Sequence, residues 1–334
     1  MASIFGLFLL NLLMLWGLDK TFFWRQLLFW IVGLLLFLLA KTVGIKSLFS
    51  LGKKLYIAAI IFLFLPLVFG GIIRGSARWI EIGGFSIQPS ELVKPFLIGA
   101  IAWQLSKIKI DKLKQLIFFI ILIAIPCFLI LIQPDLGSAG VVFLTLITLV
   151  FIAQPKLNWW LPLIAISGLI LAFSWGKLLQ PYQIDRVASF FDPQSDPLGK
   201  GYNLIQAKLA IGSGGFFGRG FGQGSQTQLA FLPEKHTDFI LAAIGEELGF
   251  LGVVFTLGFY FWLFSWMLKI ISSTEDKFGF YLKTGIFIQL LLQTSINIAV
   301  NLQLFPVVGI PLPLVSYGGS SLLSILFSLG LFLT

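Results

Sequence analysis

The chain has 334 residues, of which 58% are hydrophobic and 11% are charged. Soluble globular proteins carry about 25% charged residues, so this composition and a mean hydropathy of +0.98 exclude a soluble protein. We therefore expect an all-α polytopic membrane protein, with one integral membrane domain over residues 1–334. The net charge of +9 comes from basic residues scattered in short loops, a pattern typical of membrane topology and not of nucleic-acid binding. With one cysteine and one histidine, zinc or haem chemistry is not expected.

Ten segments approach the roughly 20 residues that cross a bilayer. They are residues 3–18, 25–42, 51–73, 90–106, 114–133, 137–153, 157–176, 238–268, 279–303 and 309–333. Loops on one side carry most of the lysines, namely Lys41, Lys46, Lys53, Lys54, Lys107, Lys109, Lys112, Lys114, Lys156, Lys269 and Lys277. The positive-inside rule then predicts that both termini are cytoplasmic and that the long loop 177–237 is extracytoplasmic.

The stretch between the third and fourth spans holds several ionisable and aromatic residues. Arg78 and Trp79 precede a Gly-Gly turn, and Ser90 is a candidate N-cap for the next helix. Glu91 and Lys94 are three residues apart, so their side chains can touch on one helix face. One interpretation is a helix cap with a local ion pair. The alternative is an anion site at the outer surface, with Arg78 and Lys94 as donors and Trp79 as a flat platform.

Three further segments carry turn or loop signals. Asp135, in QPDLG at 133–137, is expected to be the N-cap of the next helix. Residues 177–237 form the only long hydrophilic segment, in which 202–211 has the pattern of an interfacial helix, although a flexible glycine-rich linker is a close alternative. In GIPLPLVSYGGSS, 309–321, the prolines and glycines break the helix start, which is tolerated at membrane depth only inside protein or beside a cavity.

The stretch 231–249, FLPEKHTDFILAAIGEELG, gathers ionisable groups at a border between polar and apolar sequence. A helix that begins near Thr237 would place Asp238 and Glu246 on one narrow face. The broad apolar face would contact lipid or other helices. A carboxylate inside a bilayer is costly and is functional or ion-paired by default. We interpret Glu246 and Glu247 as structural partners of an intramembrane base such as Lys94.

Six segments, in this order, resemble the signature motifs of the bacterial shape, elongation, division and sporulation (SEDS) family. They are GSARWIEIGGFSIQPSELVKP, QPDLG, YQIDRVASFFDP, GYNLIQAKLAIGSGGFFGRG, QLAFLPEKHTDFILAAIGEELGFLG and LPLVSYGGSS. The resemblance runs from about residue 25 to the end, and the segments TQLAFLPEKHTDF and GIPLPLVSYGGSS favour the rod-shape branch. It implies a peptidoglycan glycosyltransferase in the bacterial cytoplasmic membrane that polymerises lipid II at the outer face during elongation. Its implied partners are a class B penicillin-binding protein and membrane proteins of the elongation machinery.

The resemblance also implies that Asp238 is the essential acid of the TDF motif. Glycan transfer needs a base at the acceptor hydroxyl and cations for the departing lipid diphosphate. The candidate cations are Arg78, Lys94, Arg186 and Lys235. No cofactor is required by the sequence, although Mg²⁺ or Mn²⁺ could bridge Asp238 or Glu234 to phosphate.

Three alternative functions remain at this point. A division-type polymerase would share the same chemistry. A lipid II flippase would need polar groups along a path through the membrane, whereas the candidate groups gather at the outer side. A non-catalytic scaffold would have no need for a base beside cationic residues. We therefore expect an outer-face polymerase.

Overall fold

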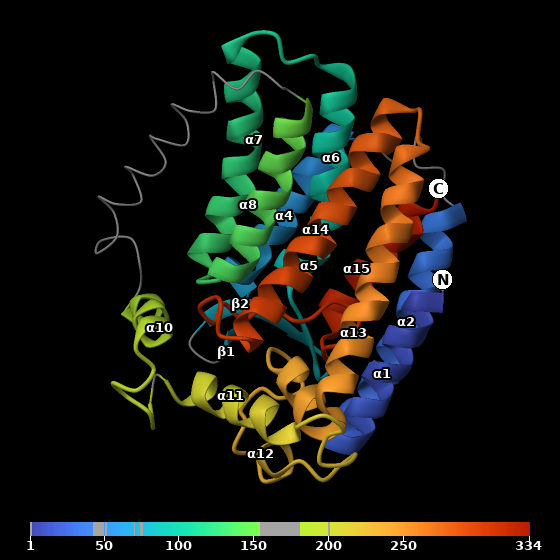
Figure 1. Ribbon diagram of the computed structural model, residues 1–334. Coiled ribbons are helices and arrows are strands. Elements are labelled where there is room, and N and C mark those ends of the chain that lie inside the picture. Colours follow the sequence, from blue (N-terminus) through green and yellow to red (C-terminus); the bar gives the residue numbers. More distant parts are fainter. Residues whose placement is uncertain are drawn as a thin grey trace.

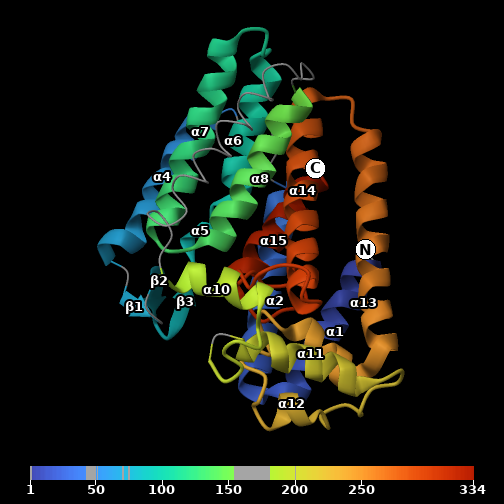
Figure 2. The same ribbon diagram turned by 60° about the vertical axis from the view of Figure 1, so that its left-hand side comes forward.

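The computed structural model describes residues 2–42, 50, 52–69, 71–73, 76–153, 181–199 and 201–334. Long helices form a bundle, and the shorter elements α10, α11 and α12 gather at one end of it (Figures 1 and 2). The helices are α1 (Ala2–Leu18), α2 (Lys20–Thr42), α4 (Gly52–Phe69), α5 (Pro89–Leu92), α6 (Lys94–Lys107), α7 (Leu113–Ile132), α8 (Leu136–Ala153), α10 (Pro181–Phe191), α11 (Tyr202–Gly214), α12 (Ser225–Gln228), α13 (Ile240–Ser272), α14 (Lys277–Asn301) and α15 (Gly319–Phe332).

The helices confirm a polytopic, multi-pass membrane architecture. Within the described ranges, six helices are long and apolar enough to cross a bilayer: α2, α4, α7, α8, α13 and α14. The shorter apolar helices α1 and α15 occupy the first and last predicted spans. The fourth predicted span is divided between α5 and α6. The seventh, 157–176, lies outside the described residues.

A small antiparallel sheet after α4 was not predicted. Strands β1 (Gly71–Ile73), β2 (Ser76–Ile82) and β3 (Phe85–Ile87) follow one another in the order β1-β2-β3. The predicted span 51–73 is therefore too long, because α4 ends at Phe69. The Gly83-Gly84 pair explains the hairpin: both residues have positive φ, 59° and 82°, as a two-residue turn of type I′ requires.

Helix α13 is broken at Gly249, where φ is 69° and ψ is −164°. The break frees backbone groups, and the loop after α11 binds them. Arg219 and Gly220 donate their N–H groups to the carbonyls of Glu246 and Glu247, at 2.9 and 3.2 Å. In return, the carbonyl of Gly215 accepts a hydrogen bond from Phe250 at 2.9 Å. The loop thus satisfies the polar groups that a break at this depth would otherwise leave unpaired.

We expect Gly249→Ala to unfold this end of the bundle. A Cβ at Gly249 would lie 2.2 Å from the backbone nitrogen of Gly218, and its φ is left-handed, which costs other residues about 1–2 kcal/mol even without a clash. Gly258→Ala, in the same helix, meets nothing within 4 Å and should stabilise by roughly 0.5–1 kcal/mol. Thermal unfolding in lipid nanodiscs compares the two variants. Equal melting temperatures would contradict the proposed close packing.

Candidate functional site

Asp238 lies in the turn that precedes α13, because the helix begins at Ile240 and not near Thr237 as predicted. Two amide side chains of α14 hold its backbone. Asn297 and Asn301 each donate a hydrogen bond from Nδ2 to the Asp238 carbonyl, both at 2.9 Å. Asn301 also accepts the N–H of Ala242 at 3.0 Å. These contacts fix the position of the Asp238 main chain relative to α14.

The residues before Asp238 are held by the broken segment before α15. The Ser316 hydroxyl donates to the carbonyl of Thr237 at 2.5 Å, and the N–H of Tyr317 donates to the carbonyl of His236 at 2.7 Å. The ring of His236 stacks on Phe22, with centroids 4.3 Å apart. The predicted break at 309–321 is confirmed, since α15 begins only at Gly319. Its irregular backbone lines the site that contains Asp238.

The stretch 307–310 brings three elements together. Arg186 of α10 donates to the carbonyl of Val307 at 3.3 Å. A Cβ at Gly309 would lie 3.6 Å from Oδ2 of Asp238, and Gly309 has a φ of +70°. A Cβ at Gly137, near the start of α8, would lie 2.5 Å from the carbonyl oxygen of Val308. Asp238 and Arg186 therefore lie at the same short stretch, which the N-terminus of α8 also approaches closely.

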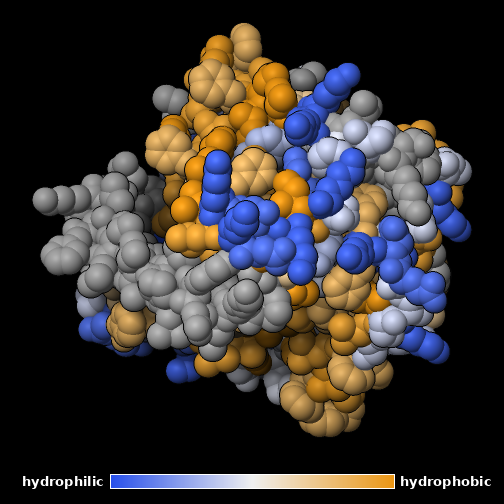
Figure 3. Space-filling model, turned by 90° about the horizontal axis from the view of Figure 1, so that it is seen from above, coloured by the Kyte–Doolittle hydropathy of each residue, from blue (hydrophilic) through white to orange (hydrophobic). Residues whose placement is uncertain are grey.

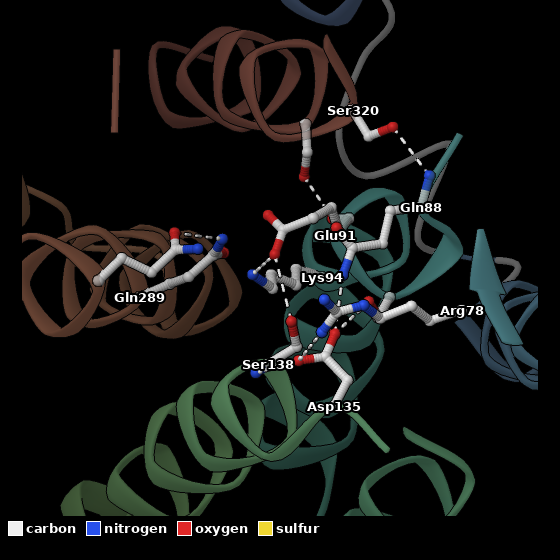
Figure 4. Close-up of polar contacts among 11 residues, drawn as sticks. Arg78, Gln88, Glu91, Lys94, Asp135, Ser138, Gln289 and Ser320 are labelled. Carbon is white, nitrogen blue, oxygen red and sulfur yellow. Dashed lines mark hydrogen bonds and ion pairs between the residues drawn. The ribbon is translucent and has the colours of Figure 1, made fainter. Parts of the chain in front are cut away.

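The carboxylate of Asp135, at the start of α8, accepts hydrogen bonds from several residues (Figure 4). Its Oδ1 accepts the backbone N–H of Ser138 at 3.1 Å, which confirms the predicted N-cap. Its Oδ2 also accepts hydrogen bonds from Gln88 at 2.7 Å and from Ser90 at 3.3 Å. Nη1 of Arg78, in β2, lies 3.9 Å from Oδ1 of Asp135. The prediction that Ser90 is an N-cap is wrong: Ser90 lies inside α5, and its hydroxyl points to Asp135.

Lys94 lies deeper in the bundle than Arg78 (Figure 4). Its Nζ is 2.5 Å from Oε1 of Glu91, so the predicted local ion pair is confirmed. Only 2% of Lys94 and 3% of Glu91 are exposed. Ser138 donates to Oε1 of Glu91 at 3.4 Å, and Ser324 donates to its carbonyl at 2.7 Å. The ion pair thus joins α5 and α6 to α8 and α15.

Glu246 and Glu247 do not pair with Lys94, contrary to our interpretation. Both are buried, and both bind the loop that contains α12. Glu246 accepts the backbone N–H groups of Gln226 at 2.8 Å and Thr227 at 2.9 Å. Glu247 accepts from the amide of Gln228 at 3.0 Å. Acceptors at the first N–H groups of a helix are favourable, so these carboxylates dock the loop onto α13. The predicted ion pair with an intramembrane base is replaced by hydrogen bonds to this loop.

Lys235 donates a hydrogen bond from Nζ to the carbonyl of Thr227, in α12. Burial lowers the pKa of Lys235, and the carboxylates of Glu247, Asp19 and Glu246 act in the opposite direction.

Glu234 and Trp79 are the last two of the site residues predicted from the sequence. The Glu234 carboxylate accepts from the Thr237 hydroxyl at 3.0 Å, which stabilises the turn before Asp238. Trp79 is half-buried in β2. Among the described residues, no group of three or more His, Cys, Asp or Glu side chains forms a metal-binding cluster.

The polar face of α14 was not predicted from the sequence. Gln289, Gln293, Asn297 and Asn301 are all buried and recur every fourth residue. Residues four apart lie on one face of a helix, so this spacing could have indicated a polar face toward the site. The stretch 307–310 was missed as well, because its contacts are made by the backbone.

The sequence model of a family described as "Cell cycle protein", which covers FtsW, RodA and SpoVE, matches residues 4–334. A "Probable peptidoglycan glycosyltransferase FtsW" of Trichlorobacter lovleyi is 38% identical over 92% of this chain and 82% of its own length. "Peptidoglycan glycosyltransferase MrdB" of Escherichia coli K12 is 40% identical over 83% of this chain and 75% of its own. The solved structure "Structural coordination of polymerization and crosslinking by a peptidoglycan synthase complex" superposes with a TM-score of 0.85 and 32% identity. The superposition covers 99% of this chain and 96% of the solved chain.

Proposed function

The chain belongs to the SEDS family and is a peptidoglycan glycosyltransferase, and from this premise we propose that it polymerises lipid II with Asp238 as general base. The observation that carries the proposal is the grouping of Asp238 and Arg186 at the stretch 307–310, at the end of the bundle that holds α10, α11 and α12. A base and a cation at one point are what transfer from a lipid diphosphate needs.

In this proposal the acceptor hydroxyl attacks the anomeric carbon of the donor sugar. The new glycosidic C–O bond forms as the bond to the undecaprenyl diphosphate breaks. Asp238 takes the hydroxyl proton, and the diphosphate leaves with the bonding electron pair. Because a sugar hydroxyl is a very weak acid, the proton moves only as the new bond forms.

Arg186 and Arg78 are the candidate diphosphate ligands that the contacts favour. Arg186 is exposed and bonds a carbonyl of the stretch near Asp238. Arg78 contacts Asp135, and its Nε is buried with no hydrogen-bond partner. A guanidinium can grip two phosphate oxygens at once. Lys94 is engaged by Glu91 and buried, so we assign it a structural role in place of direct phosphate binding. Glu234, Lys235 and Trp79 remain candidates for the rim of the site.

A divalent cation is a further part of the proposal. Mg²⁺ at phosphate-transfer sites is commonly held by one or two carboxylates together with the substrate phosphates. Asp238, with Glu234 close behind it in the turn, could supply such ligands once the diphosphate is present. Polymerisation assays with EDTA, followed by added Mg²⁺ or Mn²⁺, test this. Undiminished product in EDTA would exclude the cation.

The proposed topology places this site outside the cytoplasm. The opposite end of the bundle carries the α6–α7 loop, with Lys107, Lys109 and Lys112, and Figure 3 shows hydrophilic side chains gathered there. By the positive-inside rule that end is cytoplasmic, together with both termini. Cysteine labelling with a membrane-impermeant maleimide tests it: a cysteine at position 192 should react from outside, and one at position 109 should not.

The proposed setting is cell elongation, with a class B penicillin-binding protein as partner. The rod-shape motifs favour elongation, while the similarity to both FtsW and MrdB leaves a division-type polymerase as the alternative. The partner is supported by the likeness to a peptidoglycan synthase complex of "polymerization and crosslinking". Complementation of depleted elongation and division polymerases, each tested separately in a bacterial host, decides between the two roles.

The central experiment is polymerisation of lipid II by the purified protein, with and without a class B partner. Long glycan strands support the polymerase. If the protein makes none even with its partner, a lipid II translocation assay examines the flippase alternative, and loss of both activities would favour a scaffold.

We expect Asn301→Ala to lower the turnover number roughly tenfold with little change in KM. The substitution removes one of the two amides that hold the Asp238 carbonyl, and a base displaced by about 1 Å can cost that much or more. Gln293→Ala is the matched control, since Gln293 lies on the same face of α14 two turns away. Lipid II kinetics compare them. Equal turnover for both variants would show that Asn301 does not position the base.

A further inference from the structure

A groove between α4, α6 and α7 lies at the end of the bundle opposite Asp238. It is formed by the first residues of α4, the last turns of α6 and the first turns of α7, and it has a volume of about 200 Å³. Its walls are formed by Tyr56, Ile57, Ala100, Ile101, Phe118 and Leu122. Gly52, Lys53 and Gln104 line the end that faces the α6–α7 loop. The groove plays no part in the proposed transfer reaction.

The walls of this groove are apolar, and part of the lining is exposed on the outside of the bundle. Ile57 is 57% exposed and Phe118 is 40% exposed. The one wall hydroxyl, that of Tyr56, donates to the carbonyl of Leu122 at 2.8 Å and is therefore already satisfied. The volume exceeds the roughly 150 Å³ apolar cavity that admits benzene. It is large enough for part of one hydrocarbon chain and too small for a transmembrane helix about 10 Å in diameter.

Positive charge gathers at this end of the groove. Lys53 lines the groove itself and is exposed. Gly52 lets the indole of Trp103 approach so closely that a Cβ would lie 2.9 Å from the ring. The ammonium of Lys107 lies 4.1 Å from the centroid of that same ring. Lys53 and Lys107 therefore flank the same end, and Figure 3 views the molecule from that side.

We propose that the groove binds an anionic phospholipid, with one acyl chain between α4, α6 and α7 and the phosphate at Lys53 and Lys107. An apolar slot with Lys53 in its lining and Lys107 over the adjoining Trp103 ring matches the order of chain and headgroup in one lipid molecule. Basic residues at a membrane surface attract anionic lipids. A free phosphate would leave the apolar walls exposed, and a zwitterionic lipid would lack the net charge. In the proposed topology this lipid belongs to the cytoplasmic leaflet.

Native mass spectrometry of the delipidated full-length protein tests this site. The protein is titrated with dioleoyl phosphatidylglycerol or with dioleoyl phosphatidylcholine. The wild type should retain one phosphatidylglycerol in preference to phosphatidylcholine. Lys53→Gln should weaken that binding roughly fivefold, since a lysine near an anionic membrane contributes about 1 kcal/mol. Lys54→Gln is the matched control, because Lys54 is an exposed neighbour on the same helix that does not line the groove.

Ala100→Leu tests the acyl-chain part of the proposal by filling the slot. It should displace phosphatidylglycerol without any change in charge, and a normal melting temperature would show that the variant is folded. Equal losses of phosphatidylglycerol affinity in Lys53→Gln and Lys54→Gln would mean diffuse surface attraction. Undiminished phosphatidylglycerol binding by a folded Ala100→Leu would mean that no acyl chain enters the groove. Either result overturns the proposal. The measurements use no lipid II, so they stand or fall separately from the polymerase activity.

Discussion

Purified protein with Asp238→Asn should make no glycan strands from lipid II above background, a loss of at least roughly 10²–10⁴-fold. The amide has nearly the shape of the carboxylate but cannot accept the acceptor's proton. The backbone carbonyl of Asp238 would still accept the hydrogen bonds from Asn297 and Asn301, so the turn before α13 should keep its position. Gel analysis of the polymer, beside a thermal melt of the same sample, separates lost chemistry from lost folding.

Asp192→Asn is the matched control for that experiment. Asp192 is an exposed aspartate just after α10, at the same end of the bundle, so its substitution makes the same change in charge. It should polymerise lipid II at the wild-type rate. Should Asp238→Asn also do so, the base lies elsewhere, and Glu234, which shapes the turn before Asp238, becomes the next residue to substitute.

Lys94→Met should destabilise the protein by about 3–5 kcal/mol, because it leaves the Glu91 carboxylate buried and unpaired. The double variant Glu91→Gln/Lys94→Met removes both charges and should recover most of that loss. Melting temperatures in nanodiscs of the wild type, Lys94→Met, Glu91→Gln and the double variant form a double-mutant cycle. A double variant that is much less destabilised than the sum of its two single substitutions would assign Lys94 the role of neutralising Glu91.

Lys109→Met serves as the control for loss of a lysine. Its Nζ lies 3.3 Å from Asp111, but 87% of the Lys109 side chain is exposed. Exposed pairs contribute about 0–1 kcal/mol, so its melting temperature should hardly change. A Lys94→Met protein that melts like the wild type yet cannot polymerise lipid II would contradict the structural assignment. It would support direct contact between Lys94 and the substrate diphosphate.

Parts of this fold could be predicted because their signals are local. Apolar runs of sufficient length indicate membrane helices whatever surrounds them, and α2, α4, α7, α8, α13 and α14 lie within predicted spans or extend them by a few residues. The break before α15 follows from Pro311, Pro313 and the Gly318-Gly319 pair, which oppose a helix at any depth. The Glu91–Lys94 pair also depends only on spacing along one helical stretch.

Other features depend on partners that are distant in the chain. Glu246 could have paired with any buried base, and only the folded chain shows that its partners are backbone N–H groups about 20 residues earlier. Asp135 looks like a simple N-cap in sequence, yet Arg78, Gln88 and Ser90 reach it from a separate segment. No local pattern marks such contacts.

By itself, the sequence determined the membrane class, most of the spans and the residue types available for catalysis, because hydropathy, turn chemistry and charge act over a few neighbouring residues. Only the tertiary structure decided how those residues are combined. It brought Asp238 and Arg186 to the stretch 307–310, and it buried Lys94 against Glu91. The physical reason is that the role of a charged side chain depends on which groups lie within a few ångströms of it. In a helical bundle those neighbours are set by packing between segments far apart in the chain.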